Sequence, residues 1–309
     1  MKKAERKLQK ISGSLLISLP SNWVNHYNLK KGSKVNIGFK EDGTLIIAPE
    51  LHETKKKTET TIVYDKFFIR KFFRDYLSGT DFIKIIFKEK ILQNDRKRLY
   101  DFIQNCLMNV HIVEETSERI VLQNFRLEGM SIKACFQRMN HITSSMFEDV
   151  LNKEKGSIKE KEKNLTRFYY MSVRLIRQYL QEGGYTQDQD ISLLKAMDYR
   201  LASEKIERIA DKLKFISNRK TDSHVYKFGN KIYEKYKMAI TSFLKEDFET
   251  AISMWEKFNQ FKKEASAIEK RLMKKKDFDS IKTLHAYLQI LEYVNDIANL
   301  VRGQNKSDS

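Results

Sequence analysis

Two short patterns in the C-terminal half of the chain occur twice and in the same order, and this repetition limits the folds open to it. The pairs are ITSSMFED at 142–149 with ITSFLKED at 240–247, and IERIAD at 206–211 with LEYVND at 291–296. From about Leu127 onward strand signals are absent and amphipathic helical periodicity prevails. We therefore expect an all-α bundle of two repeats with three helices each.

The expected helical domain covers 127–303, with repeats at about 127–219 and 221–303. The first repeat is longer than the second, and its extra residues are placed most simply in the loop QEGGYTQDQD at 181–190. The polar tail at 304–309 is expected to be disordered.

The repeats also carry carboxylates four residues apart on one helical face. These are Glu207 with Asp211, which Glu204 joins one turn earlier, and Glu292 with Asp296. Like charges at this spacing destabilise a helix by about 0.2–0.5 kcal/mol, so a repeated pair needs either solvation or a cation. Helical bundles present such carboxylates inward as metal ligands. A metal site and a solvated acidic stripe are the two interpretations.

The first 50 residues have the pattern of a small β module instead. KLQKISGSLLISLP predicts a strand that bends at Gly13 and ends at Pro20, followed by a short helix with Ser21 as its N-cap. A hairpin with its turn at Asp42-Gly43 completes the module. A unit of about 50 residues buries only about 60% of its unfolded surface, so we expect it to need a partner chain.

The charge of the chain favours an acidic partner. Lys and Arg number 58 against 41 Asp and Glu, which gives a formal charge of +17. Basic residues are concentrated before and within the first predicted strand, where Arg6, Lys7 and Lys10 are the candidate contacts to DNA phosphates. The alternative for this basic run is a frayed, solvated N-terminus.

A charged, aperiodic linker is predicted at 51–60, after which 61–126 has a β-α-β-α-β-β pattern. This order predicts a small two-layer α/β domain. It carries no Gly-rich phosphate loop or nucleophile elbow, and we interpret it as a structural connector.

Several classes of protein are disfavoured by what the sequence lacks. Cys106 and Cys135 form no CxxC pair and are expected to be reduced. No apolar run is long enough for membrane insertion and no signal peptide is recognised, so the expected location is cytoplasmic. No Glu-x-x-His pair and no Ser/His/Asp or Cys/His elbow is found, so an enzyme is not expected.

The N-terminal module resembles the SpoVT/AbrB-like family. The resemblance rests on GSLLISLP, a short helix, LKKGSKV and DGTLII in this order, and it covers about the first 49 residues. It implies a swapped-hairpin β-barrel in which two chains interleave to form one dimeric DNA-binding domain. A β unit that serves only to dimerise is the alternative.

The helical half resembles the PhoU family of phosphate-uptake regulators, most closely in ASEKIERIADKL and EKNLTRFYYMSVRLIRQ. The resemblance implies paired three-helix repeats whose acidic motifs bind divalent or multinuclear metal, with zinc, iron, manganese or magnesium as candidates. One departure is that Asn164 and Thr166 stand where carboxylates are expected, which leaves Glu162 as the acidic residue there.

Together these features predict a multidomain transcriptional regulator of phosphate uptake, in an arrangement that resembles an archaeal regulator. Its expected partners are double-stranded DNA, a second copy in a homodimer, and a phosphate-transporter subunit. One alternative is a PhoU-type signalling adaptor whose N-terminal module only dimerises. Another is an antitoxin, which a bundle of this size disfavours.

Overall fold

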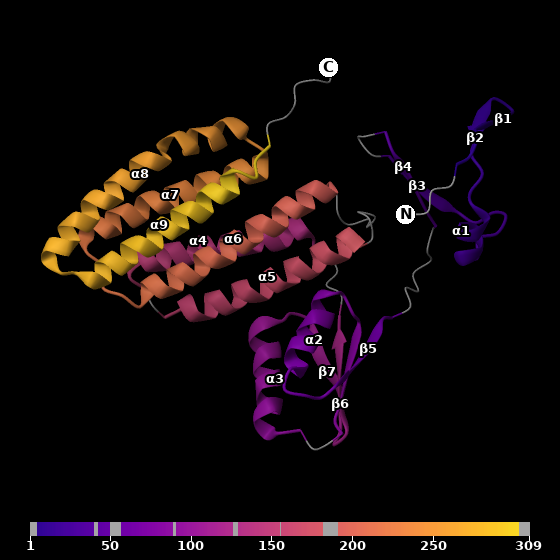
Figure 1. Ribbon diagram of the computed structural model, residues 1–309, viewed down its shortest axis with the longest axis horizontal. Helices are drawn as coiled ribbons and strands as arrows, with labels where there is room; N and C mark the ends of the chain where they lie inside the picture. The colour runs from indigo at the N-terminus through magenta and orange to yellow at the C-terminus, as the bar shows by residue number, and fades with distance from the viewer. Residues whose placement is uncertain are drawn as a thin grey trace. The chain divides into compact units, whose positions relative to one another are not determined.

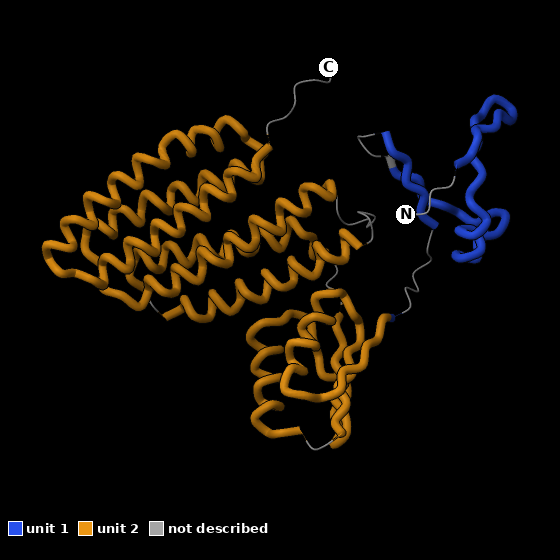
Figure 2. Tube along the Cα trace, in the orientation of Figure 1, with its two compact units in different colours: residues 1–57 blue, residues 58–309 orange. Residues whose placement is uncertain are grey.

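The computed structural model separates the chain into two compact units, residues 1–57 and 58–309, which are described one at a time (Figure 2). The residues that the structure describes are 5–39, 43–49, 57–88, 91–125, 129–154, 156–181 and 191–302. The predicted tail, nearly all of the 181–190 loop and most of the 51–60 linker lie outside them.

The N-terminal unit consists of two hairpins and one short helix. Its elements are β1 (Gln9–Ile11), β2 (Ser14–Leu16), α1 (Ser21–His26), β3 (Val35–Phe39) and β4 (Leu45–Pro49). The single bent strand predicted here is wrong, because β1 and β2 pair antiparallel. Ser12 and Gly13 join them, both with positive φ (47° and 89°), as a two-residue primed turn requires. The predicted N-cap also differs, since Pro20 and not Ser21 occupies that position.

No described residue of this unit is buried. Leu15 is 65% exposed, and Ile17, Ile37 and Leu45 each expose more than half of their surface. Apolar side chains therefore point outward from both hairpins, and those side chains of the unit that the structure describes form no core.

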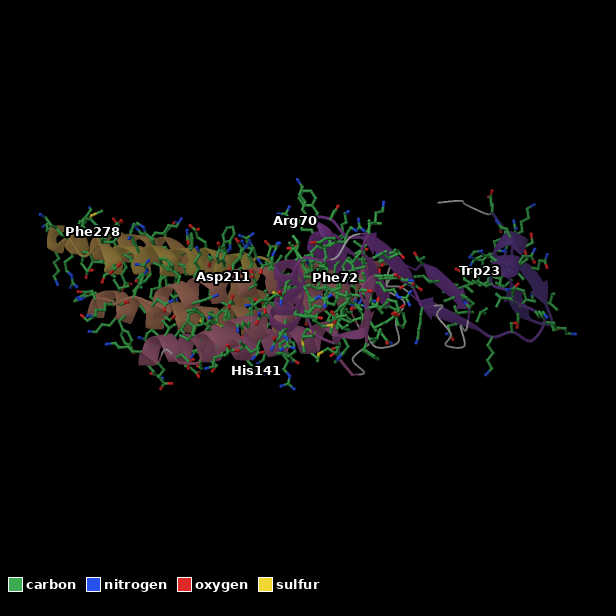
Figure 3. The ribbon with its side chains drawn as sticks, turned by 90° about the horizontal axis from the view of Figure 1, so that it is seen from below. Trp23, Arg70, Phe72, His141, Asp211 and Phe278 are labelled. Carbon is green, nitrogen blue, oxygen red and sulfur yellow. The ribbon has the colours of Figure 1, made fainter. Side chains whose placement is uncertain are left out.

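The second unit begins with an α/β part in the predicted order. Its elements are β5 (Glu59–Val63), α2 (Phe68–Leu77), β6 (Phe82–Ile86), α3 (Gln93–Cys106), β7 (Val110–Glu115) and β8 (Arg119–Asn124). The sheet order is β5-β6-β8-β7, with β5 and β6 parallel and the other pairs antiparallel. Both helices lie on one face of the sheet (Figure 1). Phe72, Ile83, Leu99 and Leu122, all with no exposed surface, form the core between the layers. Figure 3 labels Phe72 among the side chains of this part.

The remainder is a bundle of six described helices, as the repeat predicts. They are α4 (Ile132–Asn152), α5 (Ile158–Gln181), α6 (Leu193–Ser217), α7 (Ser223–Lys245), α8 (Phe248–Lys275) and α9 (Phe278–Ala298). At five helix starts the side chain of a polar N-cap residue accepts a hydrogen bond from a backbone N–H of the first turn; these N-cap residues are Ser131, Ser192, Asp222, Asp247 and Asp277. The repeated octapeptides lie at the C-terminal ends of α4 and α7, which makes α4–α6 and α7–α9 the two copies.

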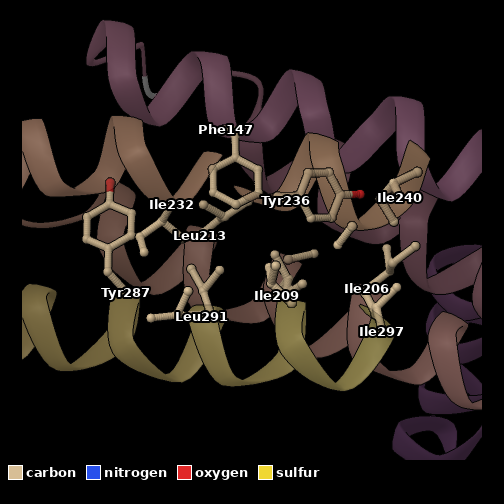
Figure 4. Close-up of a cluster of buried hydrophobic side chains, with 14 of the residues drawn as sticks. Phe147, Ile206, Ile209, Leu213, Ile232, Tyr236, Ile240, Tyr287, Leu291 and Ile297 are labelled. Carbon is tan, nitrogen blue, oxygen red and sulfur yellow. The ribbon is translucent and has the colours of Figure 1, made fainter. Parts of the chain in front are cut away.

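Helices α4, α6, α7 and α9 form the centre of the bundle, with α5 flanking the first copy and α8 the second (Figure 1). The central helices share one hydrophobic core, in which Phe147, Leu213, Tyr236 and Leu291 meet from four different helices (Figure 4). Each of these side chains is at most 2% exposed.

The α/β part is fixed to α5 by a buried arginine. Arg174 donates from Nη1 to the carbonyl of Tyr76 at 2.9 Å and from Nη2 to that of Gly79 at 3.2 Å. Its guanidinium also lies 5.0 Å from the centroid of the Tyr76 ring. These carbonyls stand at the C-terminal end of α2, where a cation is favoured by the helix dipole. These hydrogen bonds therefore satisfy the guanidinium group of Arg174, a side chain that is only 5% exposed.

Candidate nucleic-acid interface and metal site

The basic residues predicted to contact DNA are exposed. Lys10 lies within β1, opposite Leu15 of β2, and Lys7 precedes that strand. Arg6 is also exposed, and its Nη1 donates to the carbonyl of Glu5 at 2.9 Å. All three cations are thus available to solvent on the first hairpin and the chain leading into it.

Three predicted metal ligands lie near one another on the bundle. Glu207 and Asp211 are one turn apart on α6, and Glu162 of α5 is close enough to raise the pKa of both carboxyls. Burial, followed by the charge of Glu162, raises the pKa of the Cys106 thiol, so Glu162 lies near the C-terminal end of α3. Asp211, labelled in Figure 3, is exposed on α6.

Glu207 has the most perturbed carboxyl of the set. Burial, followed by the charge of Asp211, raises its pKa to about 7. Among the described residues its carboxylate forms no ion pair or hydrogen bond. The pKa of Asp211 is also raised, first by partial burial and then by Glu162, although lysines nearby oppose the shift. Such like-charge repulsion is what a bound cation relieves.

Glu204 and Glu162 already have basic partners. Glu204 accepts from Arg208 at 2.8 Å and lies 3.5 Å from Arg200, whereas Glu162 pairs with Lys214 at 2.9 Å. Sequence reasoning missed these counter-ions. The i, i+4 spacing of Arg200, Glu204 and Arg208 was the available signal.

The second repeat does not reproduce the acidic set. Glu292 is exposed on α9, and Asp296 pairs with Lys205 of α6 at 2.7 Å. The structure therefore places Asp296 beside a lysine of the first repeat of the same chain, and no pattern within one helix predicts this pair.

The donor set decides which metal could fit. In the part of the chain that the structure describes, no group of three or more His, Cys, Asp or Glu side chains could hold a metal ion. Two carboxylates suffice for a hydrated ion such as Mg²⁺, which keeps several of its waters. Glu207 and Asp211 thus fit a hydrated divalent ion but not a multinuclear cluster.

Comparison with known families identifies the N-terminal module. Residues 8–57 match the family model "Antidote-toxin recognition MazE, bacterial antitoxin". The module is of the MazE/AbrB type, and the type predicted from its motifs is confirmed.

Two solved structures are similar to the chain. One is PhoU from Pseudomonas aeruginosa, with a TM-score of 0.49 and 14% identity over 55% of this chain and 93% of that chain. The other is the phosphate transport system regulatory protein PhoU from Streptococcus pneumoniae, with a TM-score of 0.42 and 16% identity over 55% and 87%. No curated protein sequence matches the chain. No helix in the described ranges is long and apolar enough to cross a membrane.

Proposed function

We propose that the chain is a DNA-binding transcriptional regulator of phosphate uptake, without catalytic activity, that acts as a homodimer. The proposal rests on one observation above all: a MazE/AbrB-type module whose described side chains form no buried core and which exposes Arg6, Lys7 and Lys10 on and before its first hairpin. A second copy that interleaves its hairpins would cover Leu15, Ile17 and Ile37, and Arg6, Lys7 and Lys10 would then contact phosphates.

The role of the helical domain is proposed from its sequence resemblance to PhoU proteins and from its paired three-helix repeats. In this role the bundle senses phosphate status, or relays it from a transporter subunit, and changes the affinity of the module for DNA.

The DNA assignment is tested with a Lys7→Ala, Lys10→Ala double variant. Each phosphate contact that is lost should flatten the plot of log K against log salt by about 0.9 on duplex DNA. Binding to promoter fragments is measured over a range of salt concentrations. Lys227→Ala, Lys257→Ala in the bundle is the control, since it removes the same charge from exposed positions on α7 and α8. Equal slopes for the two double variants would refute the assignment.

We further propose that Glu207 and Asp211 hold a hydrated divalent ion, with Glu292 and Asp296 as a weaker second pair. When the concentration of the free metal ion is about a hundred times its dissociation constant, binding adds about 2.7 kcal/mol to the apparent free energy of unfolding. A chelator should therefore lower the melting temperature of the wild type and scarcely change that of Glu207→Gln, Asp211→Asn. If zinc, iron, manganese and magnesium all leave the melting temperature of the wild type unchanged, the metal site is refuted and these carboxylates are a solvated acidic stripe.

A second candidate function is that of an adaptor in which the N-terminal module only dimerises. It is favoured by an apolar face on α8, where Phe248 and Ile252 are each 42% exposed and Trp255 is 62% exposed. A transporter component could dock there. The description of the matched family model, toxin recognition, likewise suggests a protein partner for the module. Two measurements on a tagged chain separate the adaptor from the DNA-binding regulator. Proteins that co-purify without bound DNA support the adaptor, whereas DNA fragments that co-purify and are identified by sequencing support the regulator.

A further inference from the structure

A groove lies between α6 and α9, on the side of α6 that faces the second repeat. It encloses a cavity of about 490 Å³. Ligand pockets of about 300–1,000 Å³ are typical of small-molecule sites, so this groove can hold more than a single inorganic ion.

Cationic and ring-nitrogen groups from both helices line this groove. Lys212 comes from α6 and Lys282 from α9, and in the described part of the chain neither ammonium group has an ion-pair partner. Arg208 is held in place by Glu204, and the Nε2 atom of His285 lies 2.7 Å from Glu269. Two unpaired lysines thus face one cavity from opposite walls.

The rest of the lining is suited to an organic anion. Phe215, which is 40% exposed, and Tyr293 supply aromatic surface, and Gln289 supplies an amide. Asp211 is the single carboxylate among the described lining residues. The net charge of the lining is therefore positive, which favours a multiply charged ligand over a neutral one.

We propose that the groove binds a phosphoryl-bearing small molecule, with Lys212 and Lys282 contacting the phosphoryl oxygens. Lysine binds phosphoryl groups as a point charge, and charge-assisted hydrogen bonds of this kind are about twice as strong as neutral ones. The phosphoryl group could belong to inorganic phosphate, a short polyphosphate or a nucleotide whose base contacts Phe215. As an effector site the groove rests on the proposed regulatory function, whereas binding itself does not.

Binding is measured by calorimetry on the full chain at fixed ionic strength, with inorganic phosphate, tripolyphosphate and ATP as separate probes and a chelator present to remove metal. At least one probe should bind the wild type, and the probe that binds most tightly identifies the source. Lys212→Gln, Lys282→Gln should weaken that binding by about tenfold or more. Lys212→Arg, Lys282→Arg should retain it.

The matched control is Lys227→Gln, Lys257→Gln, which makes the same change of net charge away from the groove. Control binding within about twofold of wild type supports a specific site. The proposal is overturned if no probe binds, or if the control loses as much affinity as the groove variant. Titrating the best probe into the chain with promoter DNA then tests whether ligand binding changes the affinity for DNA. A ligand that binds without changing this affinity contradicts the regulatory role and leaves the binding site itself supported.

Discussion

The N-terminal unit and the helical bundle use the same kinds of apolar residue in opposite ways. The bundle places Phe136, Phe147 and Phe243 fully inside, on helices that one chain supplies completely. The N-terminal unit leaves Leu8 and Leu15 more than 60% exposed. Burial on folding rises with chain length, and a module of about 50 residues lies near the lower limit. The difference leads us to expect that the bundle can fold by itself, whereas the module needs the partner chain proposed above.

The self-sufficiency of the bundle is tested most strongly by Phe243→Ala. The Phe243 ring lies 5.1 Å from that of Phe136 and 5.2 Å from that of Tyr199, with no exposed surface. Its loss should lower the free energy of unfolding by about 3–5 kcal/mol. Denaturant unfolding monitored by helical circular dichroism measures this change. Phe248→Ala, at a position 42% exposed, should cost much less, and equal costs would mean that the core is not where the structure places it.

The incompleteness of the module is tested by Leu15→Ala, with Leu92→Ala as its control. Both leucines are 65% exposed in the single chain, so the single chain predicts the same small effect for both. If a second copy covers Leu15, its truncation should cost about 2 kcal/mol or more and weaken the dimer by about tenfold or more. Sedimentation over a range of concentrations measures the dimer. If Leu15→Ala and Leu92→Ala change the stability and the dimer affinity equally, no second copy covers Leu15 and the module is not incomplete.

The smallest expected effect concerns one unbalanced charge in the bundle, Glu207. The native state holds the pKa of this carboxyl at about 7, against an ordinary value of 4.5. The native chain therefore binds more protons than the unfolded chain between these values, and stability falls as the pH rises through that window. Above about pH 7 the penalty is complete.

Glu207→Gln should remove this penalty. After allowance for solvent screening of a half-buried group, the variant should be more stable than wild type by about 1 kcal/mol at pH 8, and about equal at pH 4.5. Melting curves with chelator present should show a rise of about 2–4 °C at pH 8. Glu292→Gln, at an exposed position, is the control. A gain of the same size at both pH values would show that the charge is not the cause.

The sequence predicts the helical architecture well, because a repeat such as ITSSMFED and ITSFLKED marks equivalent helix ends directly. The order of elements in the α/β part is likewise predicted, since its strands and helices differ in period. The hairpin at residues 9–16 is missed. The period-two pattern of the sequence continues across this two-residue turn, so Ser12-Gly13 has the pattern expected of a bend within one strand.

The candidate sites are predicted less completely than the fold. The pairing of Glu207 with Asp211 follows from helical spacing alone. The ion pair between Lys205 and Asp296, and the cavity that Lys212 and Lys282 both line, each involve residues of different repeats. Helix packing decides which side chains of the two repeats face each other. No pattern within one helix contains that information.

Gly229 shows what such packing demands of a single position. It lies on α7, and a Cβ atom added there would stand 2.5 Å from Cζ of Tyr287 on α9, a side chain only 2% exposed. Even alanine would force the ring away. A larger residue can therefore replace Gly229 only where the residue at 287 is smaller than tyrosine. Relatives with a larger residue at 229 should carry a smaller one at 287, a correlated substitution that links the crossing of two helices to the history of the sequence.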